Sequence, residues 1–236
     1  MQRILSTMRR AIEDYNMIEA GDKIAVGVSG GKDSLTLLAA LKTYQRFSKI
    51  PFDVLGITID LGFKGVDYSS VEKFCKKLDI PYIVKRTDIA EILFDVRNES
   101  NPCSLCSRMR RGALNDLAKE NGCSKVALGH NNEDVIETFF LSLFYEGRLN
   151  CFSPVTYLSR KAVTVIRPLI YTPEGDIKGY KNRAELPIVK NPCPMDGVSK
   201  RQEMKDFINE KALSDHHFKT RMMNAIKTGL EDWRIN

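Results

Sequence analysis

Residues 24–38 read IAVGVSGGKDSLTLL, and this stretch predicts a strand, a tight turn and a helix in direct succession. The run 23–28 is short, apolar and rich in β-branched residues, which is typical of a strand buried on both faces. A Ser/Gly-rich turn follows at 29–31, and a helix that begins with Asp33 and Ser34 continues through LTLLAALKTYQRF. Ligands bind beyond the carboxyl ends of such strands, so we expect a binding site at this turn.

The same alternation of strands and helices continues outward from this stretch. We predict strands over 53–59, 81–86, 125–129 and 163–168, and helices over 4–18, 69–78, 107–121 and 133–145, with another helix capped by Thr172 and Pro173 at its first position. The tail from 199 is expected to be helical and polar, and the loops 93–106 and 147–162 are the longest stretches without predicted structure. The pattern predicts an α/β fold with a doubly wound parallel sheet, an N-terminal helix and a helical C-terminal extension.

The composition excludes several protein classes. The chain has 236 residues, of which 43% are hydrophobic and 28% charged, which is typical of a globular protein and not of a disordered or fibrous one. No apolar run approaches the roughly 20 residues that span a bilayer, and the N-terminus lacks the apolar segment of a secretory signal. We therefore expect a cytoplasmic protein without membrane contact. The formal net charge of 36 − 30 = +6 is compatible with nucleic-acid binding.

We expect three units along the chain. They are an N-terminal helix at 1–20, a nucleotide-binding domain at 21–190 that includes a cysteine loop at 97–112, and a segment at 191–236 with a further cysteine and a helical extension.

The turn at 29–34 has the chemistry of a phosphate site. Glycines allow backbone N–H groups to approach an anion, and the helix N-terminus adds free donors and a positive dipole end. Lys32 adds a cation, and Ser29 and Ser34 add hydroxyl groups. A Walker A loop is excluded because Val26 stands where its first glycine should be, and a dinucleotide GxGxxG because Ser29 replaces its second glycine.

The hexapeptide SGGKDS resembles the pyrophosphatase loop of the N-type ATP pyrophosphatases, which cut ATP between its α- and β-phosphates. The resemblance implies that ATP is bound by the loop residues Ser29, Gly30, Gly31, Lys32, Asp33 and Ser34. An acid beside phosphates is repulsive unless a metal lies between them, so we infer Mg²⁺ at Asp33. Asp60, just after the second strand, is either a neighbour of the nucleotide or a carboxylate that caps a loop.

Six cysteines in a chain without an export signal suggest metal or redox chemistry, or core positions. Cys103 and Cys106 form a CxxC in NPCSLCSRMRRG, and Cys193 lies in NPCPMDG. A proline before a cysteine predicts an extended loop with an exposed thiol. Three cysteines suffice for an iron–sulfur cluster, whereas a structural zinc site needs a fourth ligand. We assign Cys75 and Cys123 to the core and leave Cys151 open.

These motifs together resemble the tRNA 2-thiocytidine synthetase family. Its members combine SGGKDS, a CxxC followed by SRxRRG, a downstream cysteine, and GHxxxDxxET, which is GHNNEDVIET at 129–138 here. The resemblance implies that Cys103, Cys106 and Cys193 hold a [4Fe-4S] cluster whose open iron carries sulfur. The chain departs from many relatives at Asn131 and Glu133, and it lacks a second cysteine that some show near Cys193.

Further residues follow from the same resemblance. His130 shares a helix face with Asp134, and it is expected to contact phosphate or metal or to make a capping hydrogen bond. The resemblance also implies that Gly129 contributes to the nucleotide-binding site. Arg167, in VIRPL, is expected to stabilise the leaving pyrophosphate or to form a surface ion pair. Asp33, Asp134 and the three cysteines are the predicted catalytic residues.

Basic residues beside the CxxC indicate an RNA contact. Arg108, Arg110 and Arg111 follow it directly, although a solvated basic helix face would have the same sequence. Phe144, Tyr145 and Phe152 are candidates for stacking on bases.

The favoured function is ATP-dependent thiolation of a tRNA pyrimidine, with cytidine in the anticodon loop implied by the family resemblance and uridine as the alternative. The sulfur donor would be sulfide or the persulfide of a cysteine desulfurase, and we expect a homodimer. Three other hypotheses remain. They are a lysidine synthetase, a non-catalytic redox sensor that binds nucleotide and RNA, and a cluster-free mechanism with Cys106 as persulfide carrier and Cys193 as resolving thiol.

Overall fold

The computed structural model describes residues 1–97, 102–190, 192–195 and 200–235. Its centre is a six-stranded sheet with the order β3-β2-β1-β4-β6-β5. The strands are β1 (Asp22–Gly27), β2 (Phe52–Asp60), β3 (Tyr82–Arg86), β4 (Lys125–Ala127), β5 (Val155–Leu158) and β6 (Val163–Ile166). All neighbours pair in parallel except β5 and β6, which are antiparallel. The predicted doubly wound α/β fold is confirmed.

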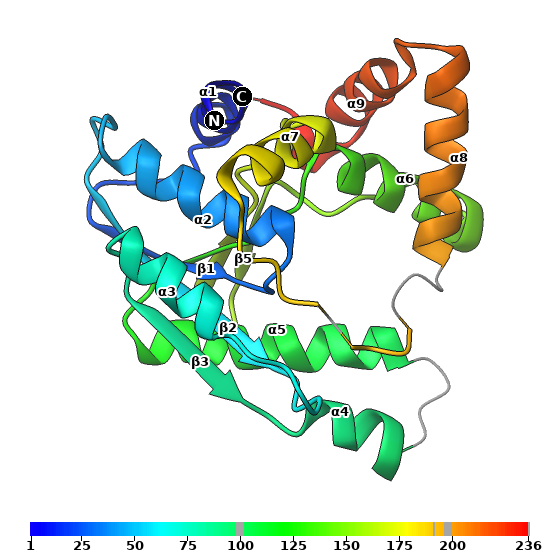
Figure 1. The fold of residues 1–236 in the computed structure, drawn as a ribbon. Helices are drawn as coiled ribbons and strands as arrows, with labels where there is room; N and C mark the ends of the chain where they lie inside the picture. The colour runs from blue at the N-terminus through cyan, green and yellow to red at the C-terminus, as the bar shows by residue number, and fades with distance from the viewer. Residues whose placement is uncertain (98–101, 191, 196–199, 236) are drawn as a thin grey trace.

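Helices cover both faces of the sheet (Figure 1). They are α1 (Gln2–Asp14), α2 (Lys32–Gln45), α3 (Ser69–Lys77), α4 (Ile89–Glu91) with a π-helical turn at Ile92–Val96, α5 (Pro102–Glu120), α6 (Asn132–Glu146), α7 (Glu174–Ala184), α8 (Lys200–Ser214) and α9 (Phe218–Gly229), followed by a 3₁₀ turn at Glu231–Trp233. In β1, Ile24 and Val26 pack into one core and Ala25 into the other. This alternation explains why the strand sequence is apolar throughout.

The two cores differ in their helices. The larger one contains side chains of α1, α2, α6, α7, α8 and α9, whereas α5 packs on the opposite face with Leu114, Leu117 and Ala118. Trp233, fully buried, stacks edge-on against Tyr15 with ring centroids 6.1 Å apart. The C-terminal segment is therefore anchored beside Tyr15, the residue that follows α1.

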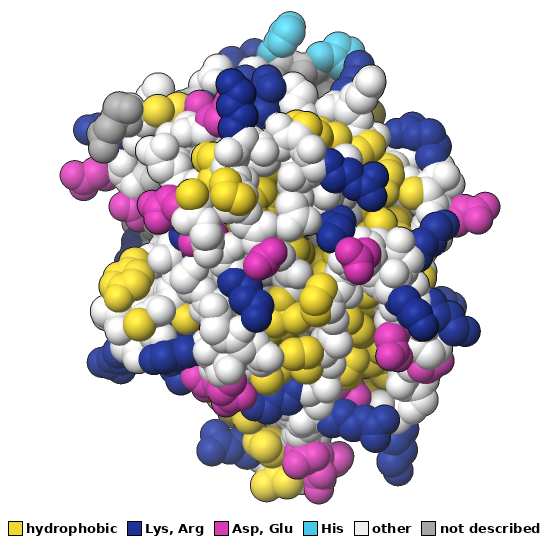
Figure 2. Space-filling model, turned by 90° about the vertical axis from the view of Figure 1, so that its left-hand side faces the viewer, with side chains coloured by type: hydrophobic (Ala, Val, Ile, Leu, Met, Phe, Trp, Pro, Cys, Tyr) yellow, Lys and Arg dark blue, Asp and Glu magenta, His cyan; other side chains and the backbone are white. Residues whose placement is uncertain are grey.

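Strand β3 is one of the two edge strands of the sheet. Figure 2 shows hydrophobic side chains exposed over the middle and lower part of the face on the β3 side, with Lys and Arg around them. In β3, Val84 is 38% exposed, and the strand ends in Lys85 and Arg86. Charged side chains on an edge strand disfavour pairing with another chain. In the described part of the chain, no helix has both the length and the apolar character needed to cross a membrane.

Four local predictions were wrong. Helix α1 ends at Asp14, and Asn16 adopts a positive φ of 47°, so the helix does not continue to 18. The loop predicted over 147–162 contains β5, a short strand whose pairing with β6 is not visible in its own sequence. The loop predicted over 93–106 contains the π-helical turn and the start of α5, and its residues 98–101 lie outside the described ones.

The fourth error concerns α7. Its cap is Pro173 and its first residue is Glu174, one position later than predicted. Thr172 instead pairs its hydroxyl with that of Thr7 at 2.8 Å, and the backbone N–H of Glu174 donates to Glu133 at 2.8 Å. A distant carboxylate thus satisfies the donor that Thr172 was expected to cap.

Candidate functional site

The predicted phosphate loop joins β1 to α2 and is braced by its own hydroxyl groups. The Ser34 hydroxyl donates to the carbonyl of Gly31 at 3.0 Å and accepts the N–H of Ser29 at 3.1 Å. No side chain of the described residues caps α2, whose N-cap is Gly31. The free N–H groups of its first turn are therefore available to an anion, as expected for a phosphate site.

Two glycines are required by close backbone approaches. A Cβ on Gly129, just after β4, would lie 3.0 Å from the carbonyl carbon of Asp33 and 3.1 Å from the nitrogen of Ser34. Gly30 has a φ of +81°, and a Cβ there would lie 2.8 Å from the Cβ of Val189. The glycines of the two sequence motifs thus allow β4 and a distal segment to pack directly on the loop.

A cavity of about 410 Å³ opens beside the loop, at the carboxyl ends of β1, β2 and β4. Its lining includes the predicted residues Ser29, Gly31, Asp33, Ser34, Asp60, Gly129 and His130, together with Arg110 and Arg111 of α5. Apolar walls come from Ile57, Ile59 and Leu128. A polar floor with apolar walls has the character of a nucleotide-binding cavity, and its size is in the range of small-molecule sites. We call it the nucleotide cavity.

Lys32 and Asp33 face a second cavity, of about 280 Å³, on the α8 side of the loop. The Lys32 ammonium lies 2.8 Å from Asp33 and 3.0 Å from Glu174, and Asn131 donates to Asp33 at 3.0 Å. Burial lowers the pKa of Lys32, but the Asp33 and Glu174 carboxylates outweigh it and raise the pKa above its ordinary value. Asp33 lines both cavities, which suits a ligand to a metal between phosphates.

Glu174 was missed by the sequence analysis. Its side chain also contacts Lys178 at 2.9 Å and Lys205 at 3.0 Å, so three lysines share one carboxylate. Burial raises the pKa of Glu174, but the three lysines outweigh it and lower the pKa to about 2. Its position directly after Thr-Pro, where helix α7 begins, was the available signal.

Asp134 serves as a helix cap and lines the second cavity. It forms a reciprocal capping box with Asn131, with contacts of 2.9 and 3.2 Å. Arg201 of α8 reaches Asp134 at 3.8 Å and Glu137 at 3.2 Å. Burial and the neighbouring Asp134 raise the pKa of Glu137 to about 7. Asn131 therefore caps α6 and also holds Asp33 by a hydrogen bond.

The three predicted cluster ligands line a third cavity, of about 150 Å³, which we call the thiol cavity. Cys103 is exposed on the first turn of α5, so the CxxC lies on a helix and not on the extended loop that we predicted. Proline is tolerated there because the N–H groups of a first turn have no helical partner. Cys106 and Cys193 are half-buried. Burial raises the pKa of Cys106, and Arg110 opposes this rise.

The three thiols of the thiol cavity fit an iron–sulfur cluster better than a single metal ion. Among the described residues, no three His, Cys, Asp or Glu side chains converge closely enough to hold a single metal ion. A four-iron cluster places its ligands on separate irons, so three thiols around an apolar cavity fit it better than they fit one zinc ion. Leu93 and Phe94 supply part of the apolar wall of this cavity.

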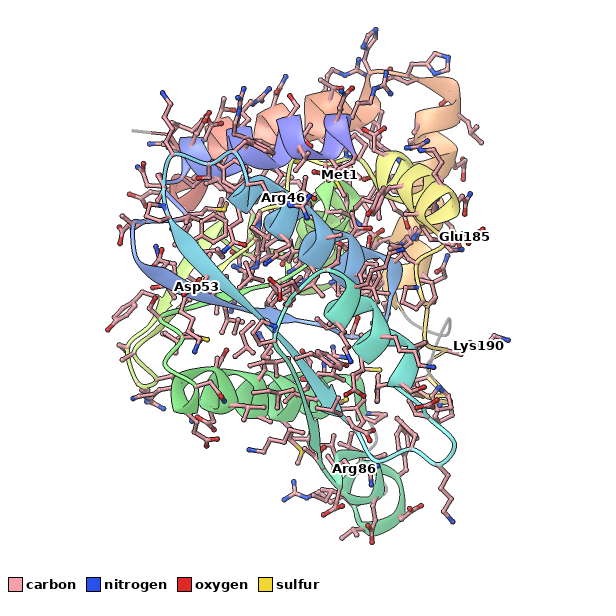
Figure 3. All side chains as sticks on the ribbon, turned by 60° about the vertical axis from the view of Figure 1, so that its left-hand side comes forward. Met1, Arg46, Asp53, Arg86, Glu185 and Lys190 are labelled. Carbon is pink, nitrogen blue, oxygen red and sulfur yellow. The ribbon has the colours of Figure 1, made fainter. Side chains whose placement is uncertain are left out.

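The nucleotide and thiol cavities share a wall made of Leu61, Phe63, Ser107 and Arg110. A segment after α7 also connects them. Val189 donates its N–H to the carbonyl of Gly30 at 3.0 Å and lines the nucleotide cavity, and Cys193 follows four residues later in the thiol cavity. Figure 3 follows this strap from Glu185, at the end of α7, to Lys190.

The other predicted residues are placed as follows. Cys75 and Cys123 are buried, as predicted, and Cys151 is also buried, with its thiol donating to Val135 at 3.3 Å. Arg108 is exposed and is absent from the described lining of the three cavities. Arg167 is 8% exposed and also lies outside these linings, so it is no surface ion pair.

Residues 3–211 match the model of the PP-loop domain family. The chain is 38% identical over 228 residues to a tRNA-cytidine(32) 2-sulfurtransferase of Pelobacter propionicus, covering 95% of this chain and 85% of that protein. It is 36% identical to the enzyme of the same name from Geotalea uraniireducens, covering 95% and 90%.

Among solved structures, it resembles the U34-tRNA thiolase NcsA from Methanococcus maripaludis with its [4Fe-4S] cluster. The TM-score is 0.79 with 27% identity, over 97% of this chain and 79% of that one. The chain therefore belongs to the PP-loop domain family, among its tRNA-cytidine(32) 2-sulfurtransferases.

Proposed function

We propose that this protein is an ATP-dependent, iron–sulfur-dependent tRNA sulfurtransferase that converts a cytidine of the anticodon loop to 2-thiocytidine. The observation that carries the proposal is the wall common to the nucleotide and thiol cavities, since a base activated in one can be attacked by sulfur presented in the other. The names of the relatives, which are tRNA-cytidine(32) 2-sulfurtransferases, support cytidine over uridine.

ATP is the substrate of the first step. The loop residues 29–34 and the first turn of α2 hold its phosphates, with Mg²⁺ between them and Asp33. The carbonyl oxygen of the base attacks the α-phosphate, and pyrophosphate leaves. The base is then an adenylate, in which a poor leaving group has become AMP. Sulfur adds at the ring carbon and AMP departs, so the oxygen of the base leaves with its phosphate.

Cys103, Cys106 and Cys193 would hold the cluster, which supplies one iron without a protein ligand where sulfur is presented. Arg110 and Arg111 project from α5 into the nucleotide cavity, where their charges compensate phosphate groups of ATP or RNA. We further propose sulfide or a desulfurase persulfide as the sulfur donor, a homodimeric state and a cytoplasmic location. The division of the chain at 20 and 190 stays a prediction.

Two measurements test this function. Iron and acid-labile sulfide are determined after anaerobic purification, with about four of each expected per chain. The gene for this chain is then introduced into a strain that lacks its own tRNA-cytidine 2-sulfurtransferase. Nucleoside analysis of the tRNA from that strain should detect 2-thiocytidine. C103S, C106S and C193S should lose both iron and product, while C123S, matched in residue type but buried away from the cavities, should keep both.

The alternatives give different results. Zinc without sulfide would refute the iron–sulfur mechanism, and full activity of iron-free protein would favour the cysteine persulfide route. A redox sensor would release no pyrophosphate with any tRNA. A 2-thiouridine product would redirect the assignment to uridine.

A further inference from the structure

Three side chains from separate parts of the chain stack behind the nucleotide cavity. His130 follows β4 and lines the cavity. Its ring centroid lies 4.8 Å from that of Phe152, with 35° between the two planes. The guanidinium of Arg167, just after β6, lies 4.9 Å from the centroid of the same phenyl ring. Phe152 therefore contacts both the histidine and the arginine.

Arg167 is held by residues outside the described lining of the nucleotide cavity. Its Nη1 donates to the carbonyl of Ser153 at 2.6 Å and to the hydroxyl of Thr156 at 3.1 Å. The carbonyl of Phe152 accepts the indole N–H of Trp233 at 3.2 Å. The hydrogen bonds of the Arg167 side chain and of the Phe152 backbone thus go to residues outside the described lining of the nucleotide cavity. Arg167 is absent from the described lining of the nucleotide cavity, so it is not placed to bind pyrophosphate there.

The surroundings of His130 keep its ring uncharged. Burial and the positive charges of Arg167, Arg201, Arg110 and Arg111 lower the pKa of His130 to about 3. Among the described residues, its Nδ1 is buried without a hydrogen-bond partner, as is the Nε of Arg167. An uncharged imidazole carries one donor and one acceptor nitrogen, so it can serve a ligand as a hydrogen-bonding group, and it is neither a cation nor the counter-charge of a phosphate.

We propose that Arg167 is a positioning residue: it acts through Phe152 to fix the His130 imidazole at the wall of the nucleotide cavity, where the ring serves the bound adenine nucleotide as an uncharged hydrogen-bonding group. This inference rests on the proposed function for the identity of the nucleotide. It assigns Arg167 a role away from pyrophosphate, which we had predicted it to bind, and it gives His130 a role other than phosphate or metal contact.

The first test uses the small number of histidines. The chain contains three, and His216 and His217 are exposed in the turn between α8 and α9. In an NMR titration of ¹³Cε1-histidine-labelled protein between pH 4 and 8, the His130 resonance should not titrate. Addition of a non-hydrolysable ATP analogue with Mg²⁺ at pH 7.5 should shift the His130 resonance only.

The variants are R167Q, R167K and F152L, with R160Q as the matched control because Arg160 is exposed in the turn between β5 and β6. R167Q and F152L should move the His130 resonance. They should also weaken analogue binding about 10- to 100-fold, the scale of a misplaced group in a site. R167K should restore part of both effects, and R160Q should change neither.

Several results would overturn the inference. One is a His130 resonance that titrates between pH 4 and 8 in the unmodified protein. Another is R167Q protein that loses analogue affinity while its His130 resonance is unchanged, which would make Arg167 a direct phosphate ligand. F152L, which keeps an apolar side chain at that position, preserves the test if R167Q does not fold. Because the titration needs neither tRNA nor a cluster, a failure of the proposed sulfur transfer leaves its result intact.

Discussion

Gly30 offers a direct test of how the strap is seated on the phosphate loop. Its φ of +81° is in the left-handed region, and a Cβ there would lie 2.8 Å from the Cβ and 3.3 Å from the Cγ2 of Val189. The substitution G30A therefore adds backbone strain and a steric overlap. Val189 also donates a hydrogen bond to Gly30, so the strap cannot shift without losing that bond.

The free-energy costs of the backbone strain and of the steric overlap can be separated. A left-handed alanine costs roughly 1–2 kcal/mol, and overpacking costs about 1–3 kcal/mol, so G30A should lower the free energy of unfolding by about 2–5 kcal/mol. Gly65 is the matched control, because its φ is +78° but its Cβ would meet nothing within 4 Å. G65A should cost only the backbone part, roughly 1–2 kcal/mol.

Urea unfolding of single and double variants measures both parts. In a V189G background, which removes the overlapping atoms, G30A should cost no more than G65A does. V189A keeps the Cβ at 2.8 Å and should therefore relieve little of the overlap. The reasoning is refuted if G30A costs the same in the V189G background as in the unmodified chain, or if G30A and G65A are equally destabilising.

Three further outcomes follow from the same structure. G129A, whose Cβ would press on the backbone of Asp33, should weaken ATP binding at least about tenfold in calorimetry. Unchanged affinity would contradict the close packing. Folding raises the pKa of Glu137 from 4.5 to about 7, so its stabilising contribution is full below pH 4.5 and is lost as the pH rises to 7. E137Q should flatten that part of the curve of unfolding free energy against pH, as measured by urea unfolding. Parallel curves for E137Q and the unmodified chain would refute the pKa shift. W233A should cost about 3–5 kcal/mol, since the indole is fully buried, and a loss below about 1 kcal/mol in thermal unfolding would argue against the C-terminal anchor.

The same short segments of the chain line both the nucleotide cavity and the thiol cavity. Ser107 and Arg110 lie one and four residues after Cys106 on α5 and line both cavities. The strap brings Val189 to the phosphate loop and Cys193 to the thiols. The residues that would hold the nucleotide phosphates and the sulfur ligands are therefore only a few positions apart in the chain.

Much of the architecture was predictable because its signals are local. The strand at 23–28, the glycine turn and the helix after it lie within one short segment, and their hydrophobic pattern reports burial on both sheet faces. The phosphate loop was equally readable, since glycines, a lysine and a helix N-terminus are needed together at one turn. Gly129 was found through its motif, although its reason, the approach to Asp33, is a contact across 96 residues.

Long-range contacts account for the features that were missed or misplaced. Strand β5 exists because β6 pairs with its four residues, and α7 starts at Glu174 because Glu133 takes its N–H. The hydrogen bonds of Arg167 to Ser153 and Thr156, and the stacking of Phe152 on His130, depend on loops whose sequences carry no period. Periodicity records which side of an element is buried, but it holds no information about which distant group fills the space beside it. Those partners are selected only when the whole chain packs.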